Sequence, residues 1–395
     1  MNVPAKAFSR PNSQTKAAWM VEEEDDNPPI DLDGAGAVGP IAEAKALSHS
    51  GDYLAARSVL EAMDLDADAN AAVTHLSVLY HLDELDVVQS ALARMVEGVL
   101  ASRAASDAYL CYLIDKAEQS CLPTKTIGDL IDLVGAREGL SGDLALAFTA
   151  AQRRQSFRIS QAPRAAKSRL VSLGLNCLPW TLLNRWGLRE PQQFSADYNP
   201  FCQASHKMAG LTEALLNNFR SYIGPDEIAL VKSAFGRELA MRRDRSVVWN
   251  HNKSSYWLND DFKNLRTNLE AKIGNFRRTC IAENAVFLIS NCPDDYPRHD
   301  FVFLKNLQEG LRIVTGKENN RIILVKQRGG RKPDQVAQID PYTFYFYCPY
   351  PDGNYKWWNN STANDEVGIA YEERFMGLLF NCLEIWGLLD GSPHQ

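Results

Sequence analysis

The chain has 395 residues, of which 45% are hydrophobic and 23% charged, and its formal net charge at pH 7 is −7. This length predicts two or three domains at about 100–200 residues each, and the composition excludes collagen-like, coiled-coil and wholly disordered proteins. Residues 1–160 carry 13 Lys and Arg against 24 Asp and Glu, whereas residues 161–395 carry 29 against 25. We therefore expect two parts with different roles and no nucleic-acid partner.

The spacing of apolar residues, cysteines and candidate metal ligands excludes several other classes of protein. No stretch approaches the roughly 18 uninterrupted apolar residues of a membrane span, and the first residues lack the apolar centre of a secretory signal. We therefore expect a cytoplasmic protein. The eight cysteines form no CxxC pair, and no His, Cys or acidic residues have metal-ligand spacing. Most thiols are expected to be buried apolar groups, and neither a metal nor another cofactor is expected.

The first third of the chain predicts a leader and an all-α module. Residues 1–35 are polar and include an acidic run, which predicts a disordered leader. Residues 36–158 are rich in Ala and Leu, with apolar residues at helical spacing on both sides of a Ser50-Gly51-Asp52 turn. Further helices are expected near 103–119, 125–135 and 141–155.

The helical pattern repeats along this module. Leu79 follows Leu47 by 32 residues, close to the period of tetratricopeptide repeats, and the first unit with Gly51 resembles such a repeat. The second unit departs from the pattern because it has Asp83 where glycine is expected. The module is therefore either helical-repeat-like or a plain helical bundle.

The pattern changes after a polar basic linker at residues 159–168. Apolar runs predict strands at 169–173, 285–290, 321–326 and 343–348. Helices are expected between and after them, near 178–187, 207–220, 259–278, 300–315 and 368–388. Strands that alternate with helices predict an α/β or α+β domain spanning residues 169–392.

The segment after the first of these strands carries the most informative motif. A glycine turn precedes Asn176, which is a natural helix cap, and Pro179 is tolerated in a first helical turn. Cys177 is thus expected at a helix N-terminus, where the partial positive charge favours the nucleophilic thiolate. A buried structural cysteine fits the same position.

This motif resembles that of a known family. Ser172-Leu-Gly-Leu-Asn-Cys177, followed by Leu182, Arg185 and Gly187-Leu188-Arg189, is similar to the opening signature of the papain-like cysteine peptidase family, a bacterial domain family of otherwise unknown function. Val247-Val248-Trp249-Asn250-His251-Asn252 fits the family's histidine segment. The similarity continues at Lys272-Ile-Gly-Asn-Phe276-Arg277-Arg278 and at Val286-Phe-Leu-Ile289, and covers about 170–330.

The resemblance implies a papain-like fold with Cys177 as nucleophile and His251 as its base. A third residue should orient the imidazole from a neighbouring strand, and Asn291 is the candidate, with Asp294 behind it. Asn176 is a helix cap or an oxyanion donor. The family's Pro-Phe-Asp-Trp block is altered here to Gln193-Phe194-Ser195-Ala196-Asp197-Tyr198, which leaves Asp197 as a supporting residue and suggests a changed or inactive site.

Three functions follow as hypotheses. The first is a cysteine hydrolase or acyltransferase that forms a covalent thioester with a peptide, amide or glycan-linked substrate, while the helical module recruits a protein partner. The second is a non-catalytic protein- and glycan- or anion-binding module linked to surface-polysaccharide assembly. Its ligand-binding candidates are Tyr350, Trp357, Trp358, Arg328 and Arg331. The third, a glycosyltransferase-like enzyme that uses aspartates such as Asp260 and Asp261, lacks a DxD motif.

Overall fold

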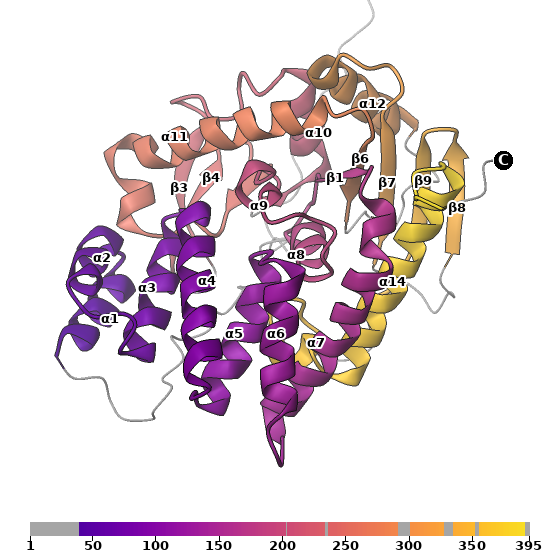
Figure 1. Cartoon of the computed structure of the whole chain (residues 1–395). Helices are drawn as coiled ribbons and strands as arrows, with labels where there is room; N and C mark the ends of the chain where they lie inside the picture. The colour runs from indigo at the N-terminus through magenta and orange to yellow at the C-terminus, as the bar shows by residue number, and fades with distance from the viewer. Residues whose placement is uncertain are drawn as a thin grey trace, which may run out of the picture.

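The structure is a computed structural model that describes residues 39–202, 204–233, 236–290, 301–327, 335–351 and 355–391 (Figure 1). The leader predicted at residues 1–35 lies outside this described part. The described chain is mixed α/β, with a helical part followed by a part in which strands and helices alternate. This confirms the predicted fold class at that level.

The helical part places consecutive helices against one another. They are α1 (Pro40–Ser50), α2 (Tyr53–Glu61), α3 (Ala69–His81), α4 (Leu85–Ser102), α5 (Asp107–Gln119), α6 (Thr124–Gly135) and α7 (Gly142–Ser160). The predicted turn around Gly51 is confirmed, since this residue ends α1 with φ of 83° and Asp52 caps α2. The predicted linker is folded: α7 runs to Ser160, and η1 (Ala162–Ala165) buries two alanines.

A five-stranded sheet forms the centre of the following part. Its order is β1 (Arg169–Ser172), β6 (Ala285–Ile289), β7 (Arg321–Lys326), β9 (Thr343–Tyr347) and β8 (Gln335–Asp340), with the first four strands parallel and β8 antiparallel to β9. The four parallel strands are those predicted from the sequence. Continuous apolar runs such as Ala285–Ile289 form such strands because helices cover both faces of the sheet.

Alternate residues of each strand face two separate cores. Phe287 and Leu324 pack with helices α10 (Met208–Leu216), α11 (Ser255–Cys280) and α12 (Phe301–Thr315). Leu288 and Val325 pack on the opposite face with α8 (Leu178–Arg185) and α14 (Glu366–Ile385). Figure 1 shows α10 to α12 on one side of the sheet and α8 with α14 on the other. The result is a layered helix–sheet–helix arrangement.

A second, antiparallel sheet was not predicted. It has the order β2 (Ser205–His206), β5 (Val247–Trp249), β4 (Glu238–Arg242) and β3 (Ile228–Lys232). The sequence of β4, ELAMR, consists of good helix formers, so local propensity gave no indication of a strand. The short helices α9 (Gln193–Ala196) and α13 (Asn360–Ala363) complete the described elements.

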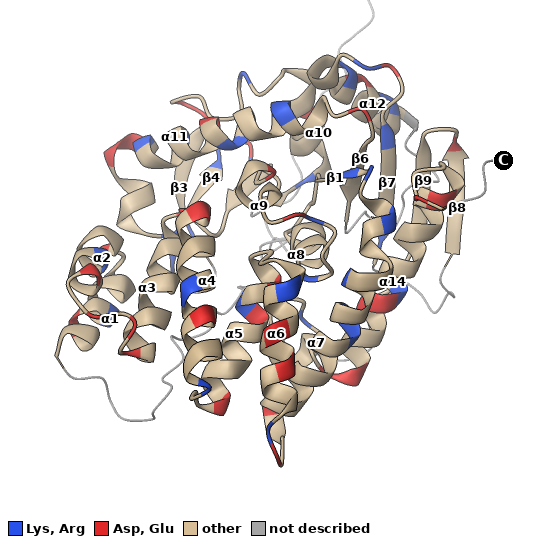
Figure 2. Cartoon of the chain, in the orientation of Figure 1, with Lys and Arg blue, Asp and Glu red and all other residues tan. Residues whose placement is uncertain are grey.

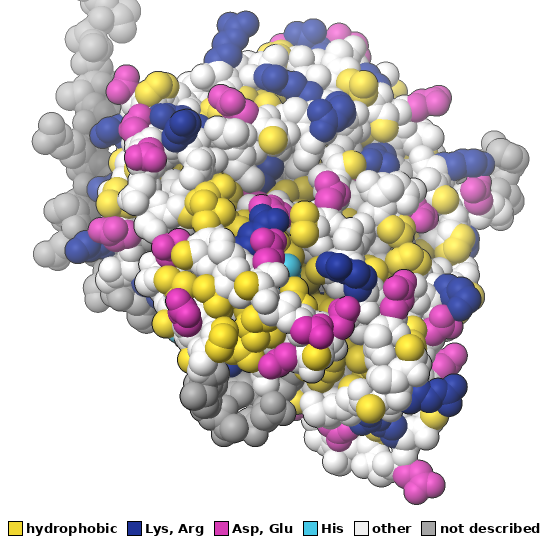
Figure 3. All heavy atoms as spheres, turned by 60° about the vertical axis from the view of Figure 1, so that its left-hand side comes forward, with side chains coloured by type: hydrophobic (Ala, Val, Ile, Leu, Met, Phe, Trp, Pro, Cys, Tyr) yellow, Lys and Arg dark blue, Asp and Glu magenta, His cyan; other side chains and the backbone are white. Residues whose placement is uncertain are grey.

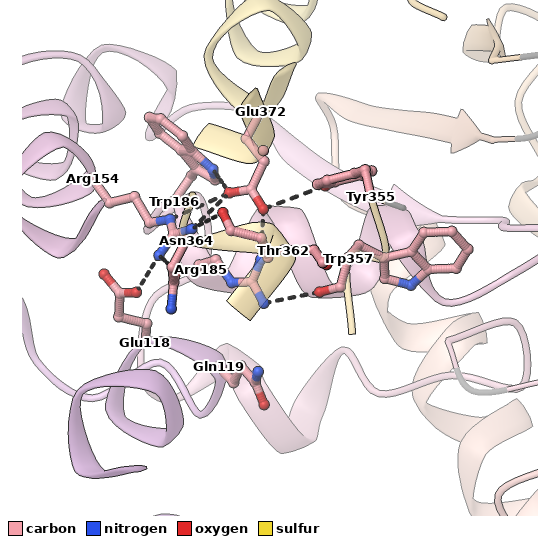
Figure 4. A network of polar contacts seen from close by, with 12 residues as sticks. Glu118, Gln119, Arg154, Arg185, Trp186, Tyr355, Trp357, Thr362, Asn364 and Glu372 are labelled. Atoms are coloured by element: carbon pink, nitrogen blue, oxygen red, sulfur yellow. Dashed lines mark hydrogen bonds and ion pairs between the residues drawn. The ribbon is translucent and has the colours of Figure 1, made fainter. Parts of the chain in front are cut away.

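Buried ion pairs join the helical part to the α/β part (Figure 4). Glu372 of α14 accepts from Arg185 of α8 over 2.5 Å and from Arg154 of α7 over 3.2 Å. Arg154 also donates to Glu118 of α5 over 2.9 Å, and Trp186 donates its indole N–H to Glu372 over 2.8 Å. These side chains are fully buried, so the two parts share one polar interior.

Two glycines of α14 predict opposite effects of one substitution. A Cβ atom at Gly377 would have no heavy atom within 4 Å, whereas one at Gly368 would lie 2.1 Å from the carbonyl oxygen of Thr362. We expect Gly377→Ala to raise the free energy of unfolding by about 0.5–1 kcal/mol, because alanine is the better helix former. Gly368→Ala should lower it by about 1–3 kcal/mol through overpacking. Urea denaturation of both variants checks this pair, and equal effects would contradict it.

Candidate active site

The turn that carries Cys177 begins at the carboxyl end of β1. Leu173 N donates to the carbonyl oxygen of Leu288 over 2.9 Å, which continues the pairing with β6. A Cβ atom at Gly174 would lie 2.0 Å from the carbonyl oxygen of Asn176, so only glycine fits this turn. Cys177 then occupies the N-cap position of α8. The predicted strand, glycine turn and helix are therefore confirmed.

Asn176 lies one residue before the N-cap Cys177, so the cap predicted at Asn176 is displaced by one residue. Its Oδ1 accepts from Leu178 N over 3.3 Å and from Ser290 Oγ, at the end of β6, over 2.7 Å. Both contacts use the amide oxygen, which fixes the direction of the amide nitrogen. The carboxyl ends of the adjacent parallel strands β1 and β6 thus meet at the segment that holds Cys177. Ligands of parallel α/β sheets bind outside this edge.

The environment of Cys177 differs from that of most other described cysteines. Cys121, Cys202, Cys280, Cys348 and Cys382 are buried, whereas Cys177 and Cys111 are half-buried. Burial raises the pKa of Cys111 to about 11 and the pKa values of Cys121, Cys202 and Cys382 to about 12. Thiols with such pKa values are protonated and inert at neutral pH. Cys177 instead combines partial exposure with a helix N-terminus.

A buried polar cluster lies against the first turn of α8, the helix that begins at Cys177. Tyr198 donates its hydroxyl to Asp83 Oδ1 over 3.0 Å, and Lys272 Nζ lies 2.8 Å from Asp83 Oδ2 and 3.3 Å from Tyr198 Oη. Burial raises the pKa of Tyr198 well above 10, and the negative charge of Asp83 acts in the same direction. The Tyr198 ring also packs 5.3 Å from the ring of Trp180, which lies in the first turn of α8, the helix whose N-cap is Cys177.

The chain segment that contains His251 contacts the same cluster through Asn252. His251 follows β5, and its neighbour Asn252 donates its amide to Asp83 Oδ2 over 3.3 Å. The partner strand β2 pairs with β5, and His206 N of β2 donates to the carbonyl oxygen of Leu175, two residues before Cys177. β2 thereby links the segment that leads into Cys177 to β5, the strand that precedes His251.

Asp197 is an internal structural residue. Its carboxylate is buried, pairs with Arg169, lies 3.7 Å from Arg189 Nε and accepts from Thr279 Oγ1 over 2.9 Å. These contacts connect the altered block to β1 and α11. The supporting role of Asp197 is therefore to stabilise the fold and not to contact a substrate. Asn291, Asp294, Arg328 and Arg331 lie outside the described residues.

The aromatic side chains proposed as ligand-binding residues pack mainly against one another. The rings of Tyr350 and Trp357 stack at 5.8 Å, and the rings of Trp357 and Trp358 meet edge to face at 4.3 Å. Tyr350 and Trp357 also pack against the core on the α8 and α14 side of the sheet. All three are half-buried, so they do not form an exposed stacking platform.

A groove of about 460 Å³ lies elsewhere, between α7 and α14. Phe157, Trp186 and Phe380 contribute apolar side chains, and Arg153 and Glu373 form an ion pair on its wall. None of the predicted site residues lines it. The aspartates considered for a glycosyltransferase, Asp260 and Asp261, lie in a kink at the start of α11, and Asp261 pairs with Arg266 over 2.9 Å.

The charge distribution and the surface give no single-sign face in the views shown. Acidic and basic side chains are interspersed along the helices in Figure 2. Figure 3 shows apolar side chains gathered among charged ones on the face that comes forward. Among the described residues, no three His, Cys, Asp or Glu side chains are grouped to hold a metal ion. No helix in the described ranges is long and apolar enough to cross a membrane.

Sequence reasoning missed the site residues that the helical part and α11 contribute. Asp83 was noted only as a departure from the repeat pattern, and that departure was the available signal. Tyr198 and Lys272 were named only as members of family segments, and their meeting could not be predicted because it depends on the packing of distant elements. No family model, no curated protein and no solved structure matches the chain.

Proposed function

We propose that the protein is a cysteine-dependent hydrolase or acyltransferase with Cys177 as the nucleophile and His251 as its base. The observation that carries this proposal is the placement of a half-buried thiol at the N-terminus of α8, on a glycine turn at the carboxyl edge of a parallel sheet. The contacts of Asn252 and Tyr198 with Asp83 support it, because Asn252 follows His251 and Tyr198 packs on Trp180 of α8.

The proposed chemistry proceeds in two steps. His251 takes the proton of Cys177, and the thiolate attacks a carbonyl carbon of an amide, peptide or glycan-linked acyl group. The carbonyl π electrons move to oxygen and return as the leaving amine departs with the proton from His251, which leaves a thioester. Water or another acceptor then releases the acyl group and the thiol. The amide nitrogen of Asn176, fixed through its bonded oxygen, is a donor for the oxyanion.

A papain-like arrangement and recruitment of a protein by the helical module remain parts of this proposal. The non-catalytic glycan- or anion-binding alternative is weaker, because the rings of Tyr350 and Trp357 stack on each other. For the catalytic proposal, the third orienting residue is proposed to follow β6, where Asn291 continues the chain from Ser290. The adjacent ends of β1 and β6 are the observation behind that choice.

Alkylation of Cys177 in the full-length chain tests the proposal. Tryptic peptide 170–185 contains this cysteine alone and peptide 104–116 contains Cys111 alone, so mass spectrometry reads both rates in one sample. We expect iodoacetamide to modify Cys177 at pH 7 at least about 100-fold faster than Cys111. His251→Ala should slow Cys177 by about 10- to 100-fold, because the thiolate loses its ion-pair partner.

The control is His49→Ala, which removes an exposed histidine of α1 and should change neither rate. The proposed mechanism would be contradicted if Cys177 were alkylated as slowly as Cys111. It would also be contradicted if His251→Ala left the alkylation rate of Cys177 unchanged. Cys177→Ala should retain the fold, as judged by circular dichroism, while it abolishes any acyl transfer found in a substrate screen. Full activity in that variant would also exclude the mechanism.

A further inference from the structure

Two turns of the helical part lie against the chain segment that follows His251. A Cβ atom at Gly51 would approach Ser254 Cβ to 2.8 Å, so the first turn packs closely on that segment. Trp257 donates its indole N–H to the carbonyl oxygen of His81, just before the second turn, over 2.9 Å. The segment after the candidate base is thus held by residues from a different part of the chain.

Asp83 makes the polar contacts of the second turn. This residue has φ of 59°, in the left-handed region that glycine usually occupies, and its side chain is 4% exposed. One carboxylate oxygen accepts from Tyr198, and the other accepts from Lys272 and Asn252. The turn therefore keeps a left-handed residue, as the first turn does at Gly51, and adds a carboxylate directed into the α/β part.

We propose that Asp83 is a positioning residue of the candidate active site, supplied by the helical part. Its carboxylate holds Tyr198, whose ring packs on Trp180 in the first turn of α8, and Asn252, which adjoins His251. The nucleophile and the base are then fixed relative to each other by a residue that belongs to neither segment. This inference rests on the proposed function, and it gives the helical part a role in assembling the site besides any recruitment of a partner.

The charges around this carboxylate distinguish its role from that of its neighbour. Lys272 is the cation that faces Asp83, and its ammonium also lies 4.3 Å from the centre of the Tyr198 ring. The next residue, Glu84, pairs instead with Arg57 of α2 over 2.7 Å, within the helical part. Two adjacent carboxylates thus face different parts of the molecule, and Glu84 provides a matched control.

The first test replaces Asp83 with glycine in the full-length chain. Glycine accommodates the left-handed backbone and is the residue expected of a repeat, so the variant removes the carboxylate and leaves the turn unstrained. We expect the alkylation rate of Cys177 at pH 7 to fall about tenfold, and its pH profile to approach that of His251→Ala. Glu84→Gln should retain the wild-type rate and profile.

A second variant separates positioning from folding. Asp83→Gly leaves the Lys272 ammonium buried without its counterion, which destabilises the fold. The double variant Asp83→Gly with Lys272→Met contains neither charge, so it should recover stability in urea denaturation while Cys177 stays slow. Recovery of the wild-type rate together with stability would overturn the positioning role. An unreactive Cys177 in the wild-type chain would contradict the proposed function itself, whereas a reactive Cys177 that is indifferent to Asp83 would overturn this inference alone.

Discussion

Glu372→Gln is expected to lower the free energy of unfolding by about 3–5 kcal/mol. The substitution keeps the shape of the side chain and removes its charge. Arg185, which is fully buried and lies 2.5 Å from Glu372, would lose its closest counterion, and the new amide would direct N–H groups at existing donors. Arg154 would retain Glu118 at 2.9 Å, so the loss falls mainly on the contact between α8 and α14. Urea denaturation of the two proteins measures the difference.

The adjacent residue is a matched control for this experiment. Glu373 pairs with Arg153 at the surface, where both side chains are about one third exposed. Solvent screens such a pair, so Glu373→Gln should change the free energy of unfolding by less than about 1 kcal/mol. Equal losses of unfolding free energy in Glu372→Gln and Glu373→Gln would contradict this prediction. They would show that the effect does not arise from the buried ion pairs.

The sequence predicted those elements whose local pattern agrees with their final environment. Arg321–Lys326 is a continuous apolar run, and it becomes a strand covered on both faces. The helix predicted after Asn176 is confirmed because its start signals act locally: Asn176 Oδ1 accepts from Leu178 N, and Pro179 lies in the first turn. The strand Glu238–Arg242 could not be predicted in this way, since its residues favour helices and only pairing with β3 and β5 makes it a strand.

The candidate site was predictable only where a motif is local. Cys177 follows from a turn and a helix start, both encoded within a few residues. Asp83 and Lys272 are separated by 189 positions, and their contact depends on how the helical part docks on α11. The one local trace of this contact is an aspartate where the repeat pattern has glycine. Asp83 departs from the repeat pattern in its side chain but keeps the left-handed backbone that glycine would have. Such a departure can mark a side chain with a role outside the repeat.

Acid is expected to destabilise the protein through His206. The ring is buried on β2, and its Nε2 lies 2.7 Å from Tyr222 Oη. Burial lowers the pKa of His206 from 6.5 to about 3, and the charge of Arg242 acts in the same direction. A lowered histidine pKa means that the folded state holds the neutral ring, so its stabilising contribution is complete above pH 6.5 and decreases as the pH falls towards 3.

The size of this effect follows from the shift at 1.36 kcal/mol per pKa unit. Between pH 7 and pH 5 the unfolded chain gains a proton at this histidine that the folded chain refuses, which lowers the free energy of unfolding by about 2 kcal/mol. His206→Gln retains a partner for Tyr222 but cannot titrate, so its loss over the same range should be smaller by about 2 kcal/mol. Urea denaturation at the two pH values measures this difference, which cancels contributions from other groups such as His75.

The control is His49→Gln, which replaces an exposed histidine and should show the wild-type pH dependence. If His206→Gln loses as much stability at pH 5 as the wild-type protein, the acid sensitivity arises elsewhere. The position of His206 links this effect to the candidate site, because its backbone joins the Cys177 turn to β5, the strand before His251. Protonation of the buried ring would loosen that joint, so acid should separate the nucleophile from its base before it unfolds the parallel sheet.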